Sequence, residues 1–316
     1  MIKMMKKSTI LSKTLDISPQ GIHYSSSNNS NNQTYQPASI KGIIEFGVYY
    51  VVGELDNEKL RIKNSIIITD TEQLIDSSDI IIVDNPQLVH YKLCQMFVPK
   101  PTVTIHETTI IHKDAELGKH ITIGPYSVIG NCVIEEGCVL GSHVEIKDNV
   151  VIKKNTQIDS NSVIGAEGMA WIWDEKGNRI MQPQLGGVII EENCKLGTDI
   201  TVVRGSLSEN TLIGTETVIA HGTKIGHGSQ IMSNVHMANN VSIAGNAIIG
   251  NRSFLGSGCV VSSNITIPEK TIIGAGAVVT KNFNEQYLTL GGVPARILKK
   301  ENFNTKPKGA PKPFKQ

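Results

Sequence analysis

The sequence is poor in aromatic residues, in excess charge and in paired cysteines. Aromatic residues make up 5% of the 316 residues, and the formal net charge is +1. A near-neutral balance gives no electrostatic basis for binding nucleic acid or a charged membrane surface. The five cysteines include no C-x-x-C pair, which argues against a disulfide framework and against a zinc site. We therefore expect reduced cysteines, no bound metal and no nucleic-acid partner.

Long apolar runs are also missing. No stretch reaches the roughly 18 uninterrupted apolar residues of a transmembrane helix, and the lysine-bearing N-terminus lacks the apolar core of a secretory signal. We therefore expect no transmembrane segment and a cytoplasmic location. The sequence contains no nucleotide P-loop, no G-x-S-x-G elbow, no Cys–His nucleophile pair and no cluster of metal ligands.

A strict six-residue period runs through residues 212–279 instead. A branched or long apolar residue returns at every sixth position: Ile213, Ile219, Ile225, Ile231, Met237, Ile243, Ile249, Leu255, Val261, Ile267, Ile273 and Val279. Four positions after most of them comes a small or β-branched residue. This period fits neither an α-helix nor an ordinary strand. It is typical of a parallel β-helix, in which three six-residue units make one triangular coil, so we predict a mainly β solenoid.

Period and composition together divide the chain into four segments. We predict a disordered leader at 1–39, because this stretch is polar and of low complexity. A small α/β domain is expected over 40–100, the β-helix over 101–287, and a G-V-P-A-R segment with a basic tail over 288–316.

Within the small domain, the apolar runs 43–52, 60–68 and 79–83 predict strands. A helix is predicted over 84–97, with Asn85 as its cap and a proline at its first position.

Two interruptions break the period, at 165–187 and at 204–210. Insertions in a solenoid leave it as loops on one face, and that face is often the binding face. The first interruption holds both tryptophans of the chain. Decorative loops without a role are the alternative, although exposed apolar loop surface needs something to cover it.

Histidine supplies the candidate general base. His221 and His227 each lie two residues past an inward isoleucine, where a side chain points outward. A coil of eighteen residues places Gly245 above His227 and Asn239 above His221. A glycine leaves its backbone N–H accessible beside the imidazole, and acyl transfer requires a base together with an oxyanion donor. We predict that His227 and Gly245 are catalytic, with a solvated surface histidine as the alternative.

These features resemble the left-handed β-helix (hexapeptide-repeat) acyltransferases. From about Val83 to Gly250 the chain is similar to the UDP-3-O-acylglucosamine N-acyltransferases. The similar stretches are VDNPQLVHYKL (83–93), SVIGAEGMAW (162–171), QPQLGGVIIEENCKLG (182–197) and VRGSLSENTLIG (203–214). The resemblance implies a left-handed coil, a nucleotide-sugar-binding role for 40–100, the catalytic histidine at His227 within IGHG (225–228), and a place near the active site for His221.

The C-terminal part also resembles the nucleotide-amino-sugar N-acetyltransferases, which use acetyl-CoA. The spacing from His227 to His236 matches the catalytic and the CoA-side histidines of that family. GAGAVVTKNF (274–283) followed by GGVPARILKK (291–300) is similar to its C-terminal segment at the CoA site. This resemblance implies that His236 and Gly274 contact CoA. The basic candidates for its phosphates are Lys281, Arg296 and Lys299, for which plain surface charge is an equal alternative.

Departures from the first family decide the expected donor. Its aromatic uridine-stacking run is not visible between Ile40 and Asn85, and its C-terminal helices, which help hold acyl carrier protein, are not seen. The acetyltransferases, for their part, often keep an acidic residue beside the catalytic histidine, whereas the neighbours here are Gly226 and Gly228, so the group that orients His227 is unassigned. We therefore expect a homotrimer that transfers an acetyl group from acetyl-CoA to the amine of a nucleotide-linked amino sugar.

Two alternatives stay open. The first is N-acylation of UDP-3-O-acylglucosamine in lipid A biosynthesis, with acyl carrier protein as donor and Met169 and Trp171 as walls of an acyl groove. The second is a catalytically inactive hexapeptide-repeat scaffold. In either enzymatic reading, His221 and Asn239 are further substrate-binding candidates.

Overall fold

The computed structural model describes residues 3–25, 29–53, 62–72, 78–99 and 104–300. The chain divides into two compact units, the first ending at Lys100 and the second beginning at Pro101. This division falls where the sequence predicts the start of the β-helix. Each unit is described by itself.

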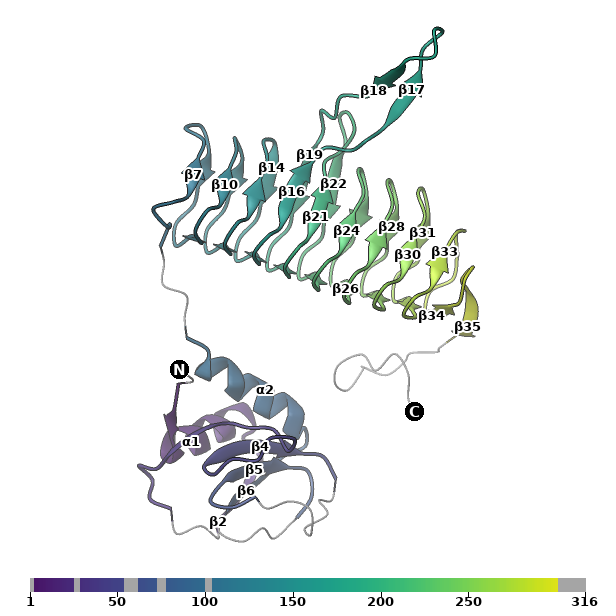
Figure 1. Cartoon of the computed structure of the whole chain (residues 1–316). Helices are drawn as coiled ribbons and strands as arrows, with labels where there is room; N and C mark the ends of the chain where they lie inside the picture. The colour runs from purple at the N-terminus through teal and green to yellow at the C-terminus, as the bar shows by residue number, and fades with distance from the viewer. Residues whose placement is uncertain (1–2, 26–28, 54–61, 73–77, 100–103, 301–316) are drawn as a thin grey trace. The chain divides into compact units, whose positions relative to one another are not determined.

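The N-terminal unit is a six-stranded sheet with two helices (Figure 1). Its strands lie in the order β1-β3-β4-β5-β6-β2; β3 to β6 are parallel, and β1 and β2 pair antiparallel at the two edges. The elements are β1 (Met5–Lys6), α1 (Lys7–Ile17), β2 (Ile22–Ser25), β3 (Thr34–Pro37), β4 (Gly47–Val51), β5 (Ile66–Thr69), β6 (Asp79–Ile82) and α2 (Pro86–Phe97).

Helix α2 begins where the sequence predicts. The N–H of Leu88 donates to Asn85 Oδ1 at 3.1 Å, and Pro86 occupies the first turn, where its missing N–H costs no hydrogen bond. Its buried Val89 and Leu93 pack in one apolar cluster with Val48 of the sheet. The predicted strands are shorter than expected, and residues 60 and 61 lie outside the described part.

The prediction of a disordered leader at 1–39 is wrong for the described residues. This segment forms α1, β1, β2 and β3, and both Ile10 and Tyr35 are fully buried in the domain. Lys7 Nζ lies 2.8 Å from Oδ2 of the buried Asp79, so an ion pair links α1 to β6. The prediction failed because it used the average composition of the segment, which is dominated by the serine- and asparagine-rich stretch 25–34. That average does not show the few residues that make contacts with the sheet. Residues 1–2 and 26–28 lie outside the described part.

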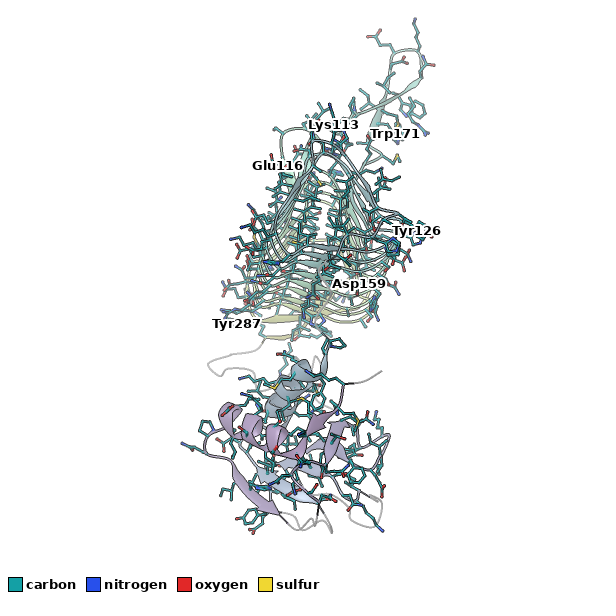
Figure 2. The ribbon with its side chains drawn as sticks, turned by 90° about the vertical axis from the view of Figure 1, so that its left-hand side faces the viewer. Lys113, Glu116, Tyr126, Asp159, Trp171 and Tyr287 are labelled. Carbon is teal, nitrogen blue, oxygen red and sulfur yellow. The ribbon has the colours of Figure 1, made fainter. Side chains whose placement is uncertain are left out.

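The second unit is a left-handed parallel β-helix, as predicted, with three sheets as the faces of a triangular prism (Figures 1 and 2). The nine-stranded sheet holds β7 (Ile110–Ile111), β10 (Val128–Ile129), β13 (Glu145–Ile146), β16 (Val163–Ala166), β21 (Thr201–Val203), β24 (Lys224–Ile225), β27 (Ser242–Ile243), β30 (Val260–Val261) and β33 (Val278–Val279). The eight-stranded sheet holds β8 (Glu116–Leu117), β11 (Val133–Ile134), β14 (Val150–Ile152), β19 (Gly187–Ile190), β22 (Asn210–Ile213), β25 (Gln230–Ile231), β28 (Ile248–Ile249) and β31 (Thr266–Ile267). The ten-stranded sheet holds β9 (Thr122–Ile123), β12 (Val139–Leu140), β15 (Gln157–Ile158), β20 (Lys195–Leu196), β23 (Val218–Ile219), β26 (His236–Met237), β29 (Phe254–Leu255), β32 (Ile272–Ile273), β34 (Leu288–Gly291) and β35 (Arg296–Lys300).

The apolar residues of the six-residue period fill the prism. Ile213 pairs with Ile231, and Ile231 with Ile249, so one coil is eighteen residues as predicted. Every apolar position of the period from 213 to 279 is at most 2% exposed. Small buried residues fit under the corners, where Thr217 and Ser229 donate their hydroxyls to backbone carbonyl oxygens. The hydroxyls of Thr217 and Ser229 are therefore paired although they are buried.

Three cysteines occupy the same small inward positions. Cys138, Cys194 and Cys259 are free and fully buried. Burial raises the pKa of Cys138 and Cys194 to about 11 and that of Cys259 to about 12. These thiols are inert core residues, in agreement with the sequence.

Figure 2 looks along the prism and labels residues on all three edges. Lys113 and Trp171 mark the edge between the nine- and eight-stranded sheets, Tyr126 and Asp159 the edge between the ten- and nine-stranded sheets, and Tyr287 the remaining edge. We call the first of these the loop edge; it consists of the corners that follow β7, β10, β13, β16, β21, β24, β27, β30 and β33. Both interruptions of the period, 165–187 and 204–210, leave the prism along it.

The first interruption is an antiparallel hairpin, β17 (Trp171–Trp173) and β18 (Arg179–Met181), which projects from the prism (Figure 1). The two tryptophan rings lie 4.8 Å apart, and the Arg179 guanidinium lies 4.6 Å above the Trp171 ring. Trp171 and Trp173 remain 43% and 57% exposed. The hairpin therefore presents aromatic surface that the chain itself does not cover.

The β-helix extends beyond the predicted limit at residue 287. β34 pairs in parallel with β32, and Leu288 and Leu290 are buried in the prism interior. β35 then returns antiparallel along β34, and the G-V-P-A-R segment forms the turn between them. The tail 301–316 lies outside the described residues. In the described part of the chain, no helix has the length and apolar character needed to cross a membrane.

Candidate active site

His227 and Gly245 meet on the loop edge. His227 follows β24 and Gly245 follows β27, and these strands pair with Ile225 opposite Ile243. A Cβ placed on Gly245 would overlap His227 Nε2 and come within 2.7 Å of His227 Cε1. Gly245 therefore packs against the Nε2 side of the imidazole, and no larger residue fits there without moving the ring.

The backbone N–H of Gly245 is the donor next to the imidazole. At some corners the matching N–H is used by a side chain of the next coil: Asn131 donates to Asp148 Oδ1 at 2.7 Å, and Ser233 to Asn251 Oδ1 at 3.0 Å. The Gly245 N–H has no hydrogen-bond acceptor among the described residues. A backbone donor is thus left unpaired directly beside the imidazole.

Ser206 is the residue that holds the other side of the His227 ring. Its Oγ lies 3.1 Å from His227 Nδ1, and it reaches this position from the 204–210 interruption, one coil before His227. The sequence reasoning missed Ser206 and left the orientation of His227 unassigned. The available signal was the break in the period itself, because a loop expelled one coil earlier on the same edge must pass beside His227.

Glu209 fixes the backbone of that loop. The N–H groups of Ser206 and Leu207 donate to its carboxylate at 2.6 and 3.1 Å. Hydrogen bonds from backbone N–H groups, first its own and then that of Ser206, lower the pKa of Glu209, and the nearby His227 adds a smaller contribution in the same direction. Glu209 is therefore ionised at neutral pH.

The stem of the first interruption supports the second. The N–H of Gly186 donates to Gly205 O at 3.1 Å, and the N–H of Leu185 donates to Ser206 O at 2.9 Å. Leu185 and Leu207 flank Ser206 and are 66% and 52% exposed. The two interruptions thus form one braced, apolar border next to the His227–Gly245 pair.

The structure does not bring His221, Asn239 and His236 to this pair. His221 and Asn239 lie on the edge between the ten- and nine-stranded sheets, where His221 Nδ1 accepts the N–H of Thr198 at 3.0 Å. His236 belongs to β26 on the ten-stranded face, with its ring 5.2 Å from that of Phe254, and desolvation lowers its pKa. Within one chain, this face lies opposite the loop edge.

The remaining candidates are divided between the same regions. Lys281 follows β33 on the loop edge, two coils beyond Gly245, because β27, β30 and β33 pair in succession. Met169 and Trp171 belong to the hairpin of that edge. Gly274 follows β32 on the edge of His221, and Arg296 opens β35 at the end of the ten-stranded sheet.

The loop edge therefore offers a base and an oxyanion donor in one place. A neutral imidazole with a free Nε2 accepts a proton, and the adjacent unpaired N–H stabilises negative charge that forms on a carbonyl oxygen. Over the described residues, no three His, Cys, Asp or Glu side chains gather where they could hold a metal ion.

Comparisons with known proteins show the same repeat. Residues 246–281 match the family model described as the hexapeptide repeat of succinyl-transferase. A stretch of 52 residues is 46% identical to a UDP-3-O-acylglucosamine N-acyltransferase of Coxiella burnetii. That stretch covers 16% of this chain and only 15% of the relative.

Solved structures extend the likeness over more of the chain. The UDP-N-acetylglucosamine O-acyltransferase of Moraxella catarrhalis superposes with a TM-score of 0.56 and 26% identity, over 61% of this chain and 72% of that one. A UDP-N-acetylglucosamine acyltransferase of Bacteroides fragilis has the same TM-score at 20% identity, covering 61% and 73% of the two chains, and shows the fold alone.

Proposed function

We propose that this chain, a hexapeptide-repeat β-helix protein similar to UDP-3-O-acylglucosamine N-acyltransferase, transfers an acyl group from a thioester to the amine of a nucleotide-linked amino sugar. The observation that carries the proposal is the stacking of His227 on Gly245, whose N–H is unpaired among the described residues. The similarity to acyltransferases supports acyl transfer as the reaction in which His227 and Gly245 take part.

The reaction follows from the two groups. The sugar amine attacks the thioester carbonyl carbon, and His227 Nε2 accepts the proton that the amine loses. The carbonyl oxygen becomes an oxyanion, to which the Gly245 N–H donates. Collapse of the tetrahedral intermediate breaks the C–S bond, and the proton held by His227 passes to the departing sulfur. A positioned base contributes about 10²–10⁴ in rate, and one oxyanion donor about 10²–10³.

For the donor, we now favour an apolar acyl chain on acyl carrier protein over acetyl-CoA. The acetyltransferase resemblance implies a CoA contact for His236 and makes Arg296 a candidate for the CoA phosphates, and within one chain both residues lie on the ten-stranded sheet, away from the loop edge. The border of the His227–Gly245 pair carries exposed Leu185 and Leu207 instead, which suits a chain longer than acetyl. Lys281, two coils beyond Gly245 on this edge, is the basic group that we assign to the donor's phosphate.

The acceptor and the assembly belong to the same proposal. The curated relative is named for UDP-3-O-acylglucosamine, and we take this compound as the acceptor. A homotrimer would cover the exposed hairpin tryptophans and provide a second wall for the open loop edge. Residues 40–100 would bind the nucleotide, and the cytoplasm stays the predicted compartment.

One experiment separates these possibilities. The purified chain is incubated with UDP-3-O-acylglucosamine and either 3-hydroxyacyl carrier protein or acetyl-CoA, and products are identified by mass spectrometry. His227→Ala removes the base, and Ser233→Ala, at the same repeat position on another edge, is the matched control. N-acylated product from the carrier, lost only in His227→Ala, is the expected result. Product from acetyl-CoA alone would overturn the donor, and no product from either donor would overturn the proposed reaction.

A further inference from the structure

Ser206 and His227 form a contact whose direction determines which ring nitrogen is the base. Ser206 Oγ lies 3.1 Å from Nδ1, while Nε2 faces Gly245. A neutral imidazole carries one proton, either on Nδ1 or on Nε2, and the hydrogen bond made by one nitrogen sets the state of the other. If Nδ1 donates to Ser206, Nε2 is free to accept a proton beside the unpaired Gly245 N–H. If Ser206 donates to Nδ1, Nε2 carries a proton and is no base.

The charges around the ring favour a proton on Nδ1. Glu209 lies in the same loop as Ser206, and its carboxylate accepts the N–H groups of Ser206 and Leu207, so the charge of this loop is negative on the side of Ser206. Arg204 is turned away, because its Nε donates to Gly186 O at 2.7 Å and its Nη2 to Asp148 O at 2.9 Å. On β24, Lys224 Nζ donates to Asp199 O at 2.7 Å rather than approaching the ring. The neighbours of Gly245 on the next coil, Ala244 and Asn246, are uncharged.

The serine is also held in place independently of the histidine. Its N–H donates to Glu209, and its carbonyl oxygen accepts the N–H of Leu185 from the stem of the hairpin loop. Both backbone groups of Ser206 are therefore fixed, which leaves the hydroxyl as the group that meets the ring. A preorganised partner loses little entropy when it binds the imidazole.

We propose that Ser206 is the positioning residue of His227: its hydroxyl oxygen accepts a hydrogen bond from Nδ1–H, and Glu209 holds the Ser206 backbone in place. The proposal deepens the proposed function and rests on it for its catalytic consequence. The state of the imidazole itself can be measured without any substrate.

The first test observes the ring directly. The whole chain is labelled with ¹⁵N-histidine, and His227 is assigned by comparison with His227→Gln. At a pH where the ring is neutral, we expect the Nδ1–H form in the natural protein and in Ser206→Thr, which keeps the hydroxyl. Ser206→Ala is expected to lose this preference, while Ser233→Ala keeps it. An Nε2–H ring in the natural protein, or no change in Ser206→Ala, would overturn the proposal.

The second test uses kinetics with the donor that proves active. Ser206→Ala is expected to lower kcat about tenfold, the rate equivalent of one hydrogen bond, with little change in KM. Ser206→Asp places a carboxylate directly on Nδ1, which raises the pKa of His227 and moves the acid limb of kcat/KM to higher pH. A purely structural serine predicts no such movement, so an unmoved limb in a folded Ser206→Asp protein contradicts the proposal.

The outcomes of the two tests distinguish failure of the proposed function from failure of the positioning role of Ser206. If the natural protein shows the Nδ1–H ring but transfers no acyl group from either donor, the proposed function fails and the positioning of His227 stands. If acyl transfer is observed and depends on His227, but Ser206→Ala leaves both the ring and kcat unchanged, the function stands and the positioning role is wrong.

Discussion

Replacing Gly245 with alanine tests the proposed catalytic pair, His227 and Gly245, by adding a single methyl group. The new Cβ would overlap His227 Nε2 and approach the ring carbons Cε1 and Cδ2 to 2.7 and 2.8 Å, so the imidazole must swing out. Gly245 does not adopt a positive φ, and alanine therefore fits the backbone itself. The substitution displaces the base and blocks the space in front of the N–H donor, while the fold of the coil stays available.

The magnitudes separate chemistry from folding. Losing a positioned base lowers the rate by about 10²–10⁴, so Gly245→Ala should fall at least about a hundredfold in kcat/KM. Its structural cost is the Ser206–His227 hydrogen bond, about 0.5–1.5 kcal/mol, which lowers Tm by no more than about 6 °C in a domain of this size. The assay is initial-rate acyl transfer, together with thermal unfolding of the same samples.

Ser233→Ala is the matched control, because it occupies the equivalent corner position on a different edge. It should keep near-normal activity and a similar Tm. A Gly245→Ala protein that folds and turns over within about threefold of the natural chain would refute the reasoning, since roughly 0.7 kcal/mol of barrier is too little for a displaced base.

Three further predictions address other parts of the chain. His227→Ala should fold and lose about 10²–10⁴ in rate; a folded variant with normal turnover would remove His227 from the mechanism. Ile10→Ala should destabilise the N-terminal unit by about 2–5 kcal/mol, because Ile10 is fully buried. If urea unfolding of that unit were unchanged, Ile10 would not be packed there, and the prediction that residues 1–39 are disordered would stand. Burial lowers the pKa of His90, whose Nε2 lies 2.9 Å from Val48 O. Above about pH 6.5 the ring is neutral in both states, and below it the unfolded chain takes up the proton first. The stability of the unit should therefore decrease as the pH falls from about 6.5 to the lowered pKa of the folded state. His90→Gln should flatten this dependence in urea unfolding followed by β4 and β5 resonances, and an equal slope in both proteins would contradict it.

The sequence determined the β-helix because its evidence is local and repeated. An apolar residue at every sixth position occupies the interior in every coil, from Ile213 to Val279. Because one coil is eighteen residues, the sequence predicts that Gly245 lies next to His227. The pairing of β24 with β27, which sets Ile225 opposite Ile243, agrees with this prediction. The helix start at Asn85 followed from one side chain and one proline.

Other features required the tertiary structure. Ser206 reaches His227 through a loop whose path depends on Glu209 and on the stem at Leu185, and no period encodes such a path. The spacing from His227 to His236 resembled a cofactor site, yet nine residues are half a coil and lead to the opposite face.

The N-terminal segment 1–39 shows that average composition also fails to reveal individual tertiary contacts. Its polar average predicted disorder, whereas Ile10, Tyr35 and the Lys7–Asp79 ion pair bind it to the sheet. Repeated short-range periodicity fixes a solenoid and its register, since each coil imposes the same condition on the next. The contacts that orient a catalytic ring or hold a leader are single and long-range, and they become visible only when the folded chain brings their residues together.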